Sequence, residues 1–146
     1  MSANEYFEKA IPILQQIQTT QLGALERAGK ACANSISVGR AAHLYGSGHS
    51  VIPVMDMFPR YGGYVGFHPI MDPRTMWFNI TGPGGARELL WIERTEGYAK
   101  QVLLSHNLDP RDTLIVYSHG GMNAAPVEIA LAGKEAGLTV VGVTSV

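Results

Sequence analysis

Two short segments of the sequence combine glycine with hydroxyl, imidazole or amide side chains. Residues 46–50 read Gly-Ser-Gly-His-Ser, and residues 118–123 read Ser-His-Gly-Gly-Met-Asn. Glycine has no Cβ atom, so neighbouring backbone N–H groups can converge on one anion, while serine hydroxyls add donors and a histidine can add a positive charge. Both segments therefore predict a phosphate site. Its candidate residues are Gly46, Ser47, Gly48, His49, Ser50, Ser118, His119, Gly120, Gly121 and Asn123.

Each segment also has a simpler interpretation as a tight turn between a strand and a helix. Neither one has the Lys-Ser/Thr pair that completes a P-loop, and Gly46-Ser47-Gly48 lacks the third glycine of a dinucleotide fingerprint. The sequence therefore does not favour a nucleotide as the ligand.

The surrounding pattern predicts how these two segments are positioned. Apolar runs at 41–45, 113–117 and 139–144 indicate strands, the last two buried on both faces. Helical spacing follows at 51–60 and at 124–136, where Asn123 is expected to cap the helix and Gly137 to end it. Ligands of open α/β sheets bind at the carboxyl ends of the strands, so both glycine segments are expected at one edge.

The remaining segments complete the expected architecture. Residues 4–38 predict one long amphipathic helix or two in succession, with Asn4 as N-cap, a kink at Pro12 and an end at Gly39. Residues 64–67 predict a strand, 68–87 a loop, and 88–106 a helix broken near Gly97. The fold class is α/β, a three-layer sandwich with a parallel sheet, and residues 1–146 form one domain.

Composition narrows the function classes. The chain has 146 residues, 46% of them apolar, with 11 Lys and Arg against 12 Asp and Glu, which disfavours a basic nucleic-acid-binding surface. No apolar run is long enough for a membrane span or a signal peptide, so a cytoplasmic protein is expected. The single cysteine, Cys32, excludes an internal disulfide and a cysteine-based zinc site, and no metal or cofactor is predicted.

The two glycine segments, Gly62-Gly63 and the closing Val143-Thr144-Ser145 resemble the SIS (sugar isomerase) domain family. The nearest similarity is to uncharacterised bacterial members whose first loop reads Gly-Ser/Thr-Gly-His-Ser, and it covers nearly the whole chain. The resemblance implies a flavodoxin- or Rossmann-type sheet of five parallel strands. It also implies a phosphorylated sugar or other carbohydrate derivative bound between the two loops, and a homodimer or homotetramer.

The chain departs from the family pattern in three ways. Gly120 and Asn123 replace a serine and a Ser/Thr of the Ser-x-Ser-Gly-x-Ser/Thr loop, and Met122 stands where look-alikes often have arginine. Losing a charge-assisted hydrogen bond costs about 1.5–3 kcal/mol, so weaker phosphate binding is expected unless His49 or His119 compensates. The sequence also ends at Val146, after what resembles the fourth family strand. We expect that strand at an unprotected edge, in a fragment or in a protomer completed by association, and favour the fragment.

Aldose–ketose isomerisation needs groups that move protons between carbons and serve the sugar oxygens. The candidates are Asp56, Glu128 and His49. The alternative for Asp56 is a solvated surface residue, and for Glu128 a charge that complements a helix dipole. Two functions stay open: a phosphosugar-binding protein with possible metal-free isomerase activity, and a non-catalytic sugar-phosphate sensor or partner-binding module.

Overall fold

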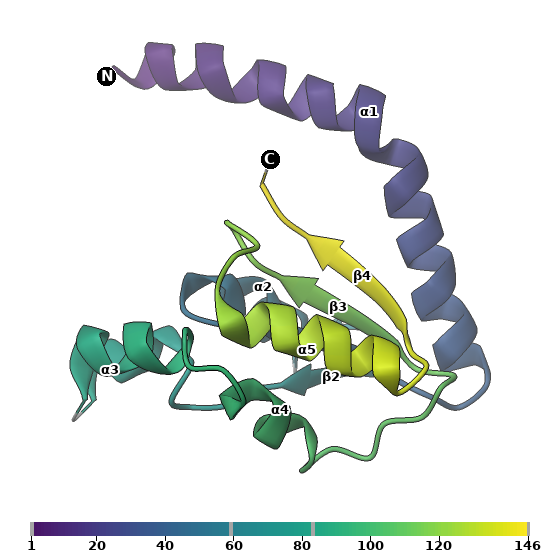
Figure 1. The fold of residues 1–146 in the computed structure, drawn as a ribbon. Coiled ribbons are helices and arrows are strands. Elements are labelled where there is room, and N and C mark those ends of the chain that lie inside the picture. The colour runs from purple at the N-terminus through teal and green to yellow at the C-terminus, as the bar shows by residue number, and fades with distance from the viewer. Residues whose placement is uncertain (1, 59, 83, 146) are drawn as a thin grey trace.

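A parallel sheet lies at the centre of the molecule (Figure 1). The structure, a computed structural model, describes residues 2–58, 60–82 and 84–145, and within them the strand order is β2-β1-β3-β4. The strands are β1 (Ala42–Gly46), β2 (Phe67–Ile70), β3 (Thr113–Tyr117) and β4 (Thr139–Val143). All pairs are parallel, so the fold class predicted from the sequence is confirmed.

Helices cover both faces of this sheet. They are α1 (Ala3–Ser37), α2 (Ile52–Met57), α3 (Gly85–Ile92), α4 (Tyr98–Leu103) and α5 (Ala124–Glu135), with 3-10 turns η1 (His49–Val51) and η2 (Trp77–Thr81). Adjacent strand residues point to opposite faces. Tyr45 and Leu114 therefore pack with α4 and α5, while Leu44 packs with Val51 and Val54 before and within α2.

Helix α1 is a single helix rather than two. Ser2, not Asn4, is its N-cap, because the Ser2 hydroxyl accepts from the Glu5 backbone N–H and completes a capping box. Pro12 lies inside the helix, and the hydroxyls of Thr19 and Thr20 bond back to carbonyls of the preceding turn. Both features bend helices, and Figure 1 shows α1 as a bent helix whose concave side faces the sheet.

Two expectations about element bounds differ from the structure, and one expected break is confirmed. The second strand covers Phe67–Ile70 rather than 64–67. The helical segment expected at 88–106 is broken near Gly97 as predicted, into α3 and α4. The helix expected at 51–60 is shorter, and residue 59 lies outside the described part. Strand β4 was expected to be buried on both faces, but its residues are exposed or half-buried. It lies at the edge of the sheet, the position that the resemblance to the SIS family implied. Val146 lies outside the described residues.

Candidate functional site

The two glycine segments meet at the carboxyl ends of β1 and β3, where they line one pocket of about 630 Å³. Residues 47–50 form one wall and residues 118–123 another. Side chains from the end of η2 and from α3 form the third wall. These residues are Ile80, Ala86, Leu89, Leu90 and Glu93. The pocket therefore joins two polar loops to an apolar surface.

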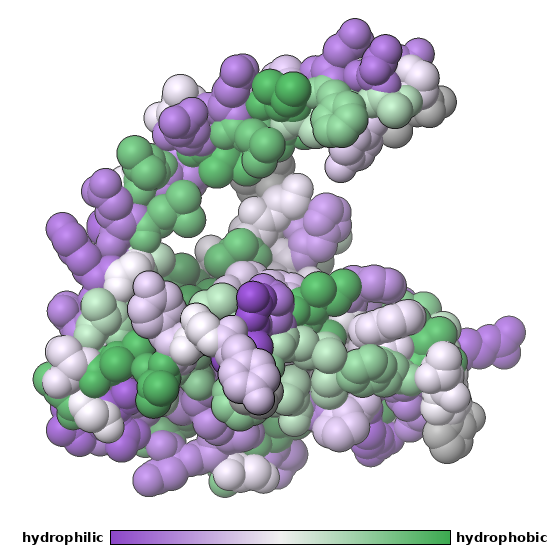
Figure 2. All heavy atoms as spheres, turned by 180° about the vertical axis from the view of Figure 1, so that it is seen from behind, coloured by the Kyte–Doolittle hydropathy of each residue, from purple (hydrophilic) through white to green (hydrophobic). Residues whose placement is uncertain are grey.

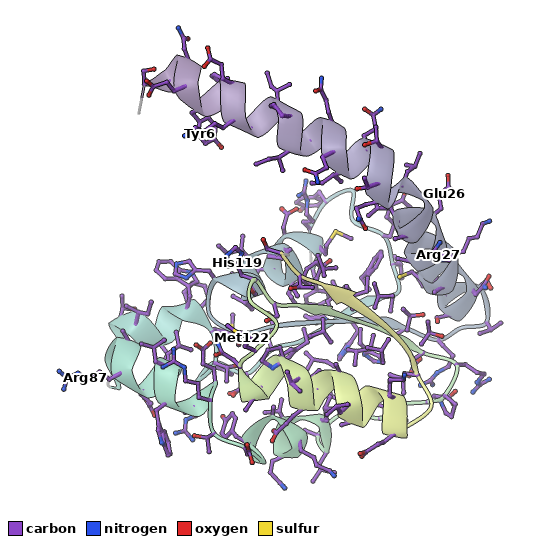
Figure 3. The ribbon with its side chains drawn as sticks, turned by 45° about the horizontal axis from the view of Figure 1, so that its top comes forward. Tyr6, Glu26, Arg27, Arg87, His119 and Met122 are labelled. Atoms are coloured by element: carbon purple, nitrogen blue, oxygen red, sulfur yellow. The ribbon has the colours of Figure 1, made fainter. Side chains whose placement is uncertain are left out.

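The second loop offers free hydrogen-bond donors. Figure 3 shows His119 and Met122 on this loop, between β3 and α5. Within the described part of the chain, the N–H groups of Gly120, Met122 and Asn123 have no acceptor. The Ser118 hydroxyl accepts from the Gly121 N–H at 3.1 Å, which leaves its own proton available for a ligand. Helix α5 begins immediately after this loop, and its positive end adds to the attraction for an anion.

The first loop, residues 46–50, was also predicted to donate hydrogen bonds to a phosphate, but some of its donors bond to other atoms of the protein. The Gly48 N–H donates to the Thr75 carbonyl at 2.7 Å, and the Ser50 N–H donates to Ser47. A Cβ atom on Gly46 would lie 2.0 Å from the Ser50 carbonyl oxygen, so this glycine is required by a close turn. Gly48 has a φ of +55°, which also favours glycine. The predicted glycines here therefore shape a tight turn, and this turn uses two of the backbone donors of the loop.

A buried carboxylate also lines the pocket. Glu93 follows the last turn of α3, is 7% exposed, and accepts a hydrogen bond from the Ser47 hydroxyl at 3.2 Å. Its backbone carbonyl accepts from the Ala125 N–H at the start of α5, which fixes the end of α3 against that helix. Sequence reasoning missed Glu93, because the run Glu-Arg-Thr-Glu at 93–96 is typical of an exposed helix end. Leu89, one helical turn earlier, was the available signal that this face is buried.

The predicted proton-transfer residues do not all reach the pocket. His49 lines it, with its ring stacked on Trp77 at a centroid distance of 5.5 Å. Asp56 lies on the exposed side of α2 in an ion pair with Arg60, and is not among the residues that line the pocket. Glu128 accepts a hydrogen bond from the Gly97 N–H, outside the pocket lining. Asn123 is the N-cap of α5, but its side chain makes no capping bond.

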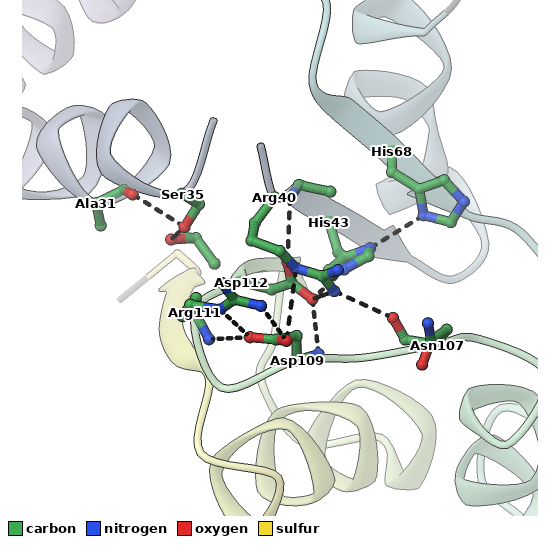
Figure 4. A network of polar contacts seen from close by, with 11 residues as sticks. Ala31, Ser35, Arg40, His43, His68, Asn107, Asp109, Arg111 and Asp112 are labelled. Carbon is green, nitrogen blue, oxygen red and sulfur yellow. Dashed lines mark hydrogen bonds and ion pairs between the residues drawn. The ribbon is translucent and has the colours of Figure 1, made fainter. Parts of the chain in front are cut away.

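A second polar cluster lies at the opposite, amino ends of the strands (Figure 4). Asp112 precedes β3 and accepts two hydrogen bonds from Arg40. His43 Nε2 lies 3.2 Å from Asp112 Oδ2, and His43 Nδ1 lies 3.0 Å from His68 Nδ1. Burial by itself raises the pKa of Asp112, but the Arg40 guanidinium and backbone N–H groups outweigh it and hold that pKa well below its usual range.

Two histidines near this cluster, His68 and His106, have lowered pKa values, which favours their neutral form. Burial lowers the pKa of His68, and the neighbouring His43 and His106 lower it further. Burial and His43 likewise lower the pKa of His106, whose ring lies 5.4 Å from that of His68. Over the described residues, no group of three or more His, Cys, Asp or Glu side chains is arranged to hold a metal ion. In the same part of the chain, no helix combines the length and apolarity needed to cross a bilayer.

Comparison with known protein families and sequences finds similarity over nearly the whole chain. The family model for the SIS domain matches residues 5–145. A UPF0309 protein from Halalkalibacterium halodurans is 37% identical over 140 residues, which cover 96% of this chain and 54% of that protein. A UPF0309 protein from Streptomyces coelicolor is 32% identical over 146 residues, 99% of this chain and 56% of the relative. The chain thus spans about half the length of these relatives.

Two solved structures share the fold. A phosphoheptose isomerase from Neisseria gonorrhoeae superposes with a TM-score of 0.72 at 16% identity, covering 97% of this chain and 72% of that one. A phosphoheptose isomerase from Francisella tularensis gives a TM-score of 0.70 at 19% identity, with 99% and 76% covered. At these identities the likeness concerns the arrangement of helices and strands.

Proposed function

The chain belongs to the SIS domain family, and from this membership and the geometry of its pocket we propose that it binds a phosphorylated sugar or sugar derivative. The observation that carries the proposal is the set of free donors on the second loop. The N–H groups of Gly120, Met122 and Asn123 find no acceptor among the described residues, and they lie beside the positive end of α5. A phosphate accepts hydrogen bonds at each of its oxygens and carries the complementary charge.

The charges in the pocket also favour one orientation of the ligand. Glu93 lies beside the first loop, hydrogen-bonded to Ser47, and a phosphate dianion placed there would be repelled by its carboxylate. The phosphate therefore binds at residues 118–123, and the carbonyl end of the sugar points toward the first loop. The apolar side chains of Ile80, Leu89 and Leu90 cover the carbon skeleton. An aldose–ketose isomerase is the activity that this arrangement favours.

Thermal stabilisation by ligands tests the binding proposal. We expect glucose 6-phosphate, fructose 6-phosphate or a seven-carbon ketose phosphate to raise the midpoint of unfolding, and the matching unphosphorylated sugars to leave it unchanged. Ser118→Ala removes one hydroxyl donor and should weaken binding by about tenfold, since a hydrogen bond to a charged group contributes about 1.5 kcal/mol or more.

The matched control for that experiment is Ser105→Ala, which changes an exposed serine after α4 and should leave affinity unchanged. If none of the sugar phosphates stabilises the wild-type protein, the proposed function is wrong. If phosphorylated and unphosphorylated sugars stabilise the protein equally, the pocket binds sugars but the proposed phosphate site is wrong. Proton NMR of the same mixtures then separates an isomerase, which interconverts the sugars, from a sensor, which binds them without turnover.

A further inference from the structure

We propose that Glu93 is the catalytic base of this pocket, the group that carries a proton between the two carbons of an aldose–ketose pair. This inference rests on the proposed function and names the residue that would perform its chemistry. It differs from the expectation drawn from the sequence, in which the carboxylates were Asp56 and Glu128.

Position is the first argument. Glu93 is the acidic side chain among the residues that line the pocket, and it lies where both loops and α3 meet. Asp56 pairs with Arg60 on an exposed helix face, with 66% of its side chain accessible. Glu128 is held by the Gly97 N–H on another side of α5. A general base must lie within hydrogen-bond reach of the proton that it removes, and only a pocket residue meets that condition.

The second argument is the environment of the carboxylate. Glu93 is buried next to Leu89 and beneath the first loop, so little water competes for its oxygens. It forms no ion pair with any residue in the described ranges, so no side-chain cation blocks its lone pairs. The Ser47 hydroxyl donates to Oε2, and this bond holds the carboxylate at the pocket wall. Ser47 is therefore a positioning residue for Glu93.

Rigid support is the third argument. Glu93 lies at the end of α3, where its N–H donates to the Leu89 carbonyl at 3.0 Å and its carbonyl accepts from Ala125 at 3.0 Å. The backbone that carries this side chain is thus joined both to α3 and to the helix that follows the phosphate loop. A phosphate bound at residues 118–123 and a base on residue 93 would keep a fixed spacing, which proton transfer requires.

The reaction needs no external reactant. Glu93 takes the C2 proton of the aldose, the C2–H electron pair becomes the C1=C2 bond of an enediol, and the carbonyl oxygen O1 gains a proton. The O2 hydroxyl then loses its proton as C2=O forms, and C1 receives the proton held by Glu93. His49 and His119 line the same pocket and can exchange the oxygen-bound proton. All atoms and electrons balance within the sugar and the protein.

Glu93→Gln separates this role from a structural one. The amide oxygen can still accept the Ser47 hydrogen bond, but an amide does not remove a carbon-bound proton. In deuterated water, we expect the wild-type protein to exchange the C1 or C2 proton of glucose 6-phosphate, fructose 6-phosphate or a seven-carbon ketose phosphate. The variant should bind the same sugar with an affinity within about threefold but exchange the proton about 10²- to 10⁴-fold more slowly. Both quantities are measured by proton NMR.

Two further variants complete the test. Glu96→Gln changes an exposed carboxylate of the same segment and should leave exchange unchanged. Glu93→Asp keeps the acid but withdraws it by one methylene, and should recover part of the lost rate; it also serves if the glutamine variant does not fold.

Several outcomes overturn the assignment. One is unchanged exchange in Glu93→Gln, particularly if Asp56→Asn or Glu128→Gln abolishes it. Another is that Glu93→Gln loses both sugar binding and proton exchange, which indicates a structural role for Glu93. A wild-type protein that binds a sugar phosphate but exchanges no proton also overturns it, and leaves the binding proposal standing. Absence of binding by the wild-type protein overturns the proposed function itself.

Discussion

A hydroxyl has one proton to donate, and Ser47 donates it to Glu93. This single contact changes the interpretation of the first loop. The sequence predicts Ser47 as a phosphate donor, whereas the structure uses its proton to hold a carboxylate. Ser118 keeps its proton free, since its oxygen accepts from the Gly121 N–H. Two serines in similar sequence settings thus have different chemistry, and the difference depends on Glu93, which is far away in the chain.

The histidine cluster predicts how stability depends on pH. The pKa values of His68 and His106 are lower in the folded chain than their ordinary value near 6.5. Well above that pH, these histidines are neutral in both the folded and the unfolded chain, so they do not change the free energy of unfolding. As the pH falls from about 7 to about 5, the unfolded chain takes up protons first and the free energy of unfolding decreases. The negative charge of Asp112 raises the pKa of His68 and so opposes this decrease. Arg40, which donates a hydrogen bond to Asp112, neutralises part of the charge of that carboxylate. We expect the midpoint of thermal unfolding to decrease over this range.

The double variant His68→Asn, His106→Asn provides the check on that prediction. The unfolding midpoint of this variant should depend less on pH in the same window, because the two imidazoles with lowered pKa values are absent from it. The carboxylates Asp109 and Asp112 do not change this slope, because their pKa values are below the usual range, so the stability that they contribute is constant in this window and is lost only at lower pH. A wild-type unfolding midpoint that stays constant from about pH 7 to about pH 5 would contradict the assigned histidine shifts.

At the scale of elements, two helix glycines predict opposite effects of alanine. A Cβ on Gly29 in α1 meets no atom within 4 Å, so Gly29→Ala should raise the free energy of unfolding by about 0.5–1 kcal/mol through helix propensity. A Cβ on Gly133 in α5 would lie 2.5 Å from Leu114 Cδ2, so Gly133→Ala should lower it by about 1–3 kcal/mol. Urea denaturation measures both. The double variant Gly133→Ala, Leu114→Val should lose less unfolding free energy than the sum of the losses of the two single variants, because the smaller valine makes room for the added methyl group. Strictly additive losses would argue against contact between the methyl group added at residue 133 and the Leu114 side chain.

Most elements could be predicted from local sequence, and the exceptions have physical reasons. The apolar runs of β1 and β3 and the helical spacing of α5 are local signals, and Gly137 has the expected left-handed φ of +85°. Strand β2 was misplaced, because Phe67-His68-Pro69-Ile70 shows neither alternation nor a continuous apolar run and lies at an edge, where proline is tolerated.

The candidate site was predictable only in part. Both glycine loops could be located, since each combines turn residues with a preceding apolar strand. Glu93 could not, because its burial depends on how the end of α3 packs against the start of α5. The placement of Asp56 and Glu128 outside the pocket lining likewise follows from the orientation of α2 and α5, which periodicity does not determine.

At the scale of the whole molecule, α1 extends beyond the sheet and exposes apolar side chains. Figure 3 shows Tyr6 near its far end, and Figure 2 shows apolar side chains gathered along much of the concave side of the helix. Leu14 is 65% exposed and Ile17 is 43% exposed. A homodimer or homotetramer stays a prediction, and this stripe is the surface on which we expect a second copy to pack.

Sedimentation of two matched double variants tests that prediction. Leu14→Glu with Ile17→Glu places two charges in the apolar stripe and should convert an oligomer to a monomer. Gln15→Glu with Gln18→Glu adds the same charge to exposed polar positions of the same helix and should leave the mass unchanged. A wild-type chain that sediments as a monomer at high micromolar concentration would show that the stripe is not a contact between copies.

Parallel strands give the molecule two distinct poles. The Ser118 loop leaves β3 at one end, while Asp112 and His43 lie at the other. Four steps along a strand span about 13 Å, and at that separation two unit charges interact by only about 1 kcal/mol for an effective dielectric constant of about 20. Protonation at the histidine pole should therefore change the phosphate affinity at the other pole by less than about tenfold. Acid tolerance could then be engineered at one pole while ligand affinity is retained at the other.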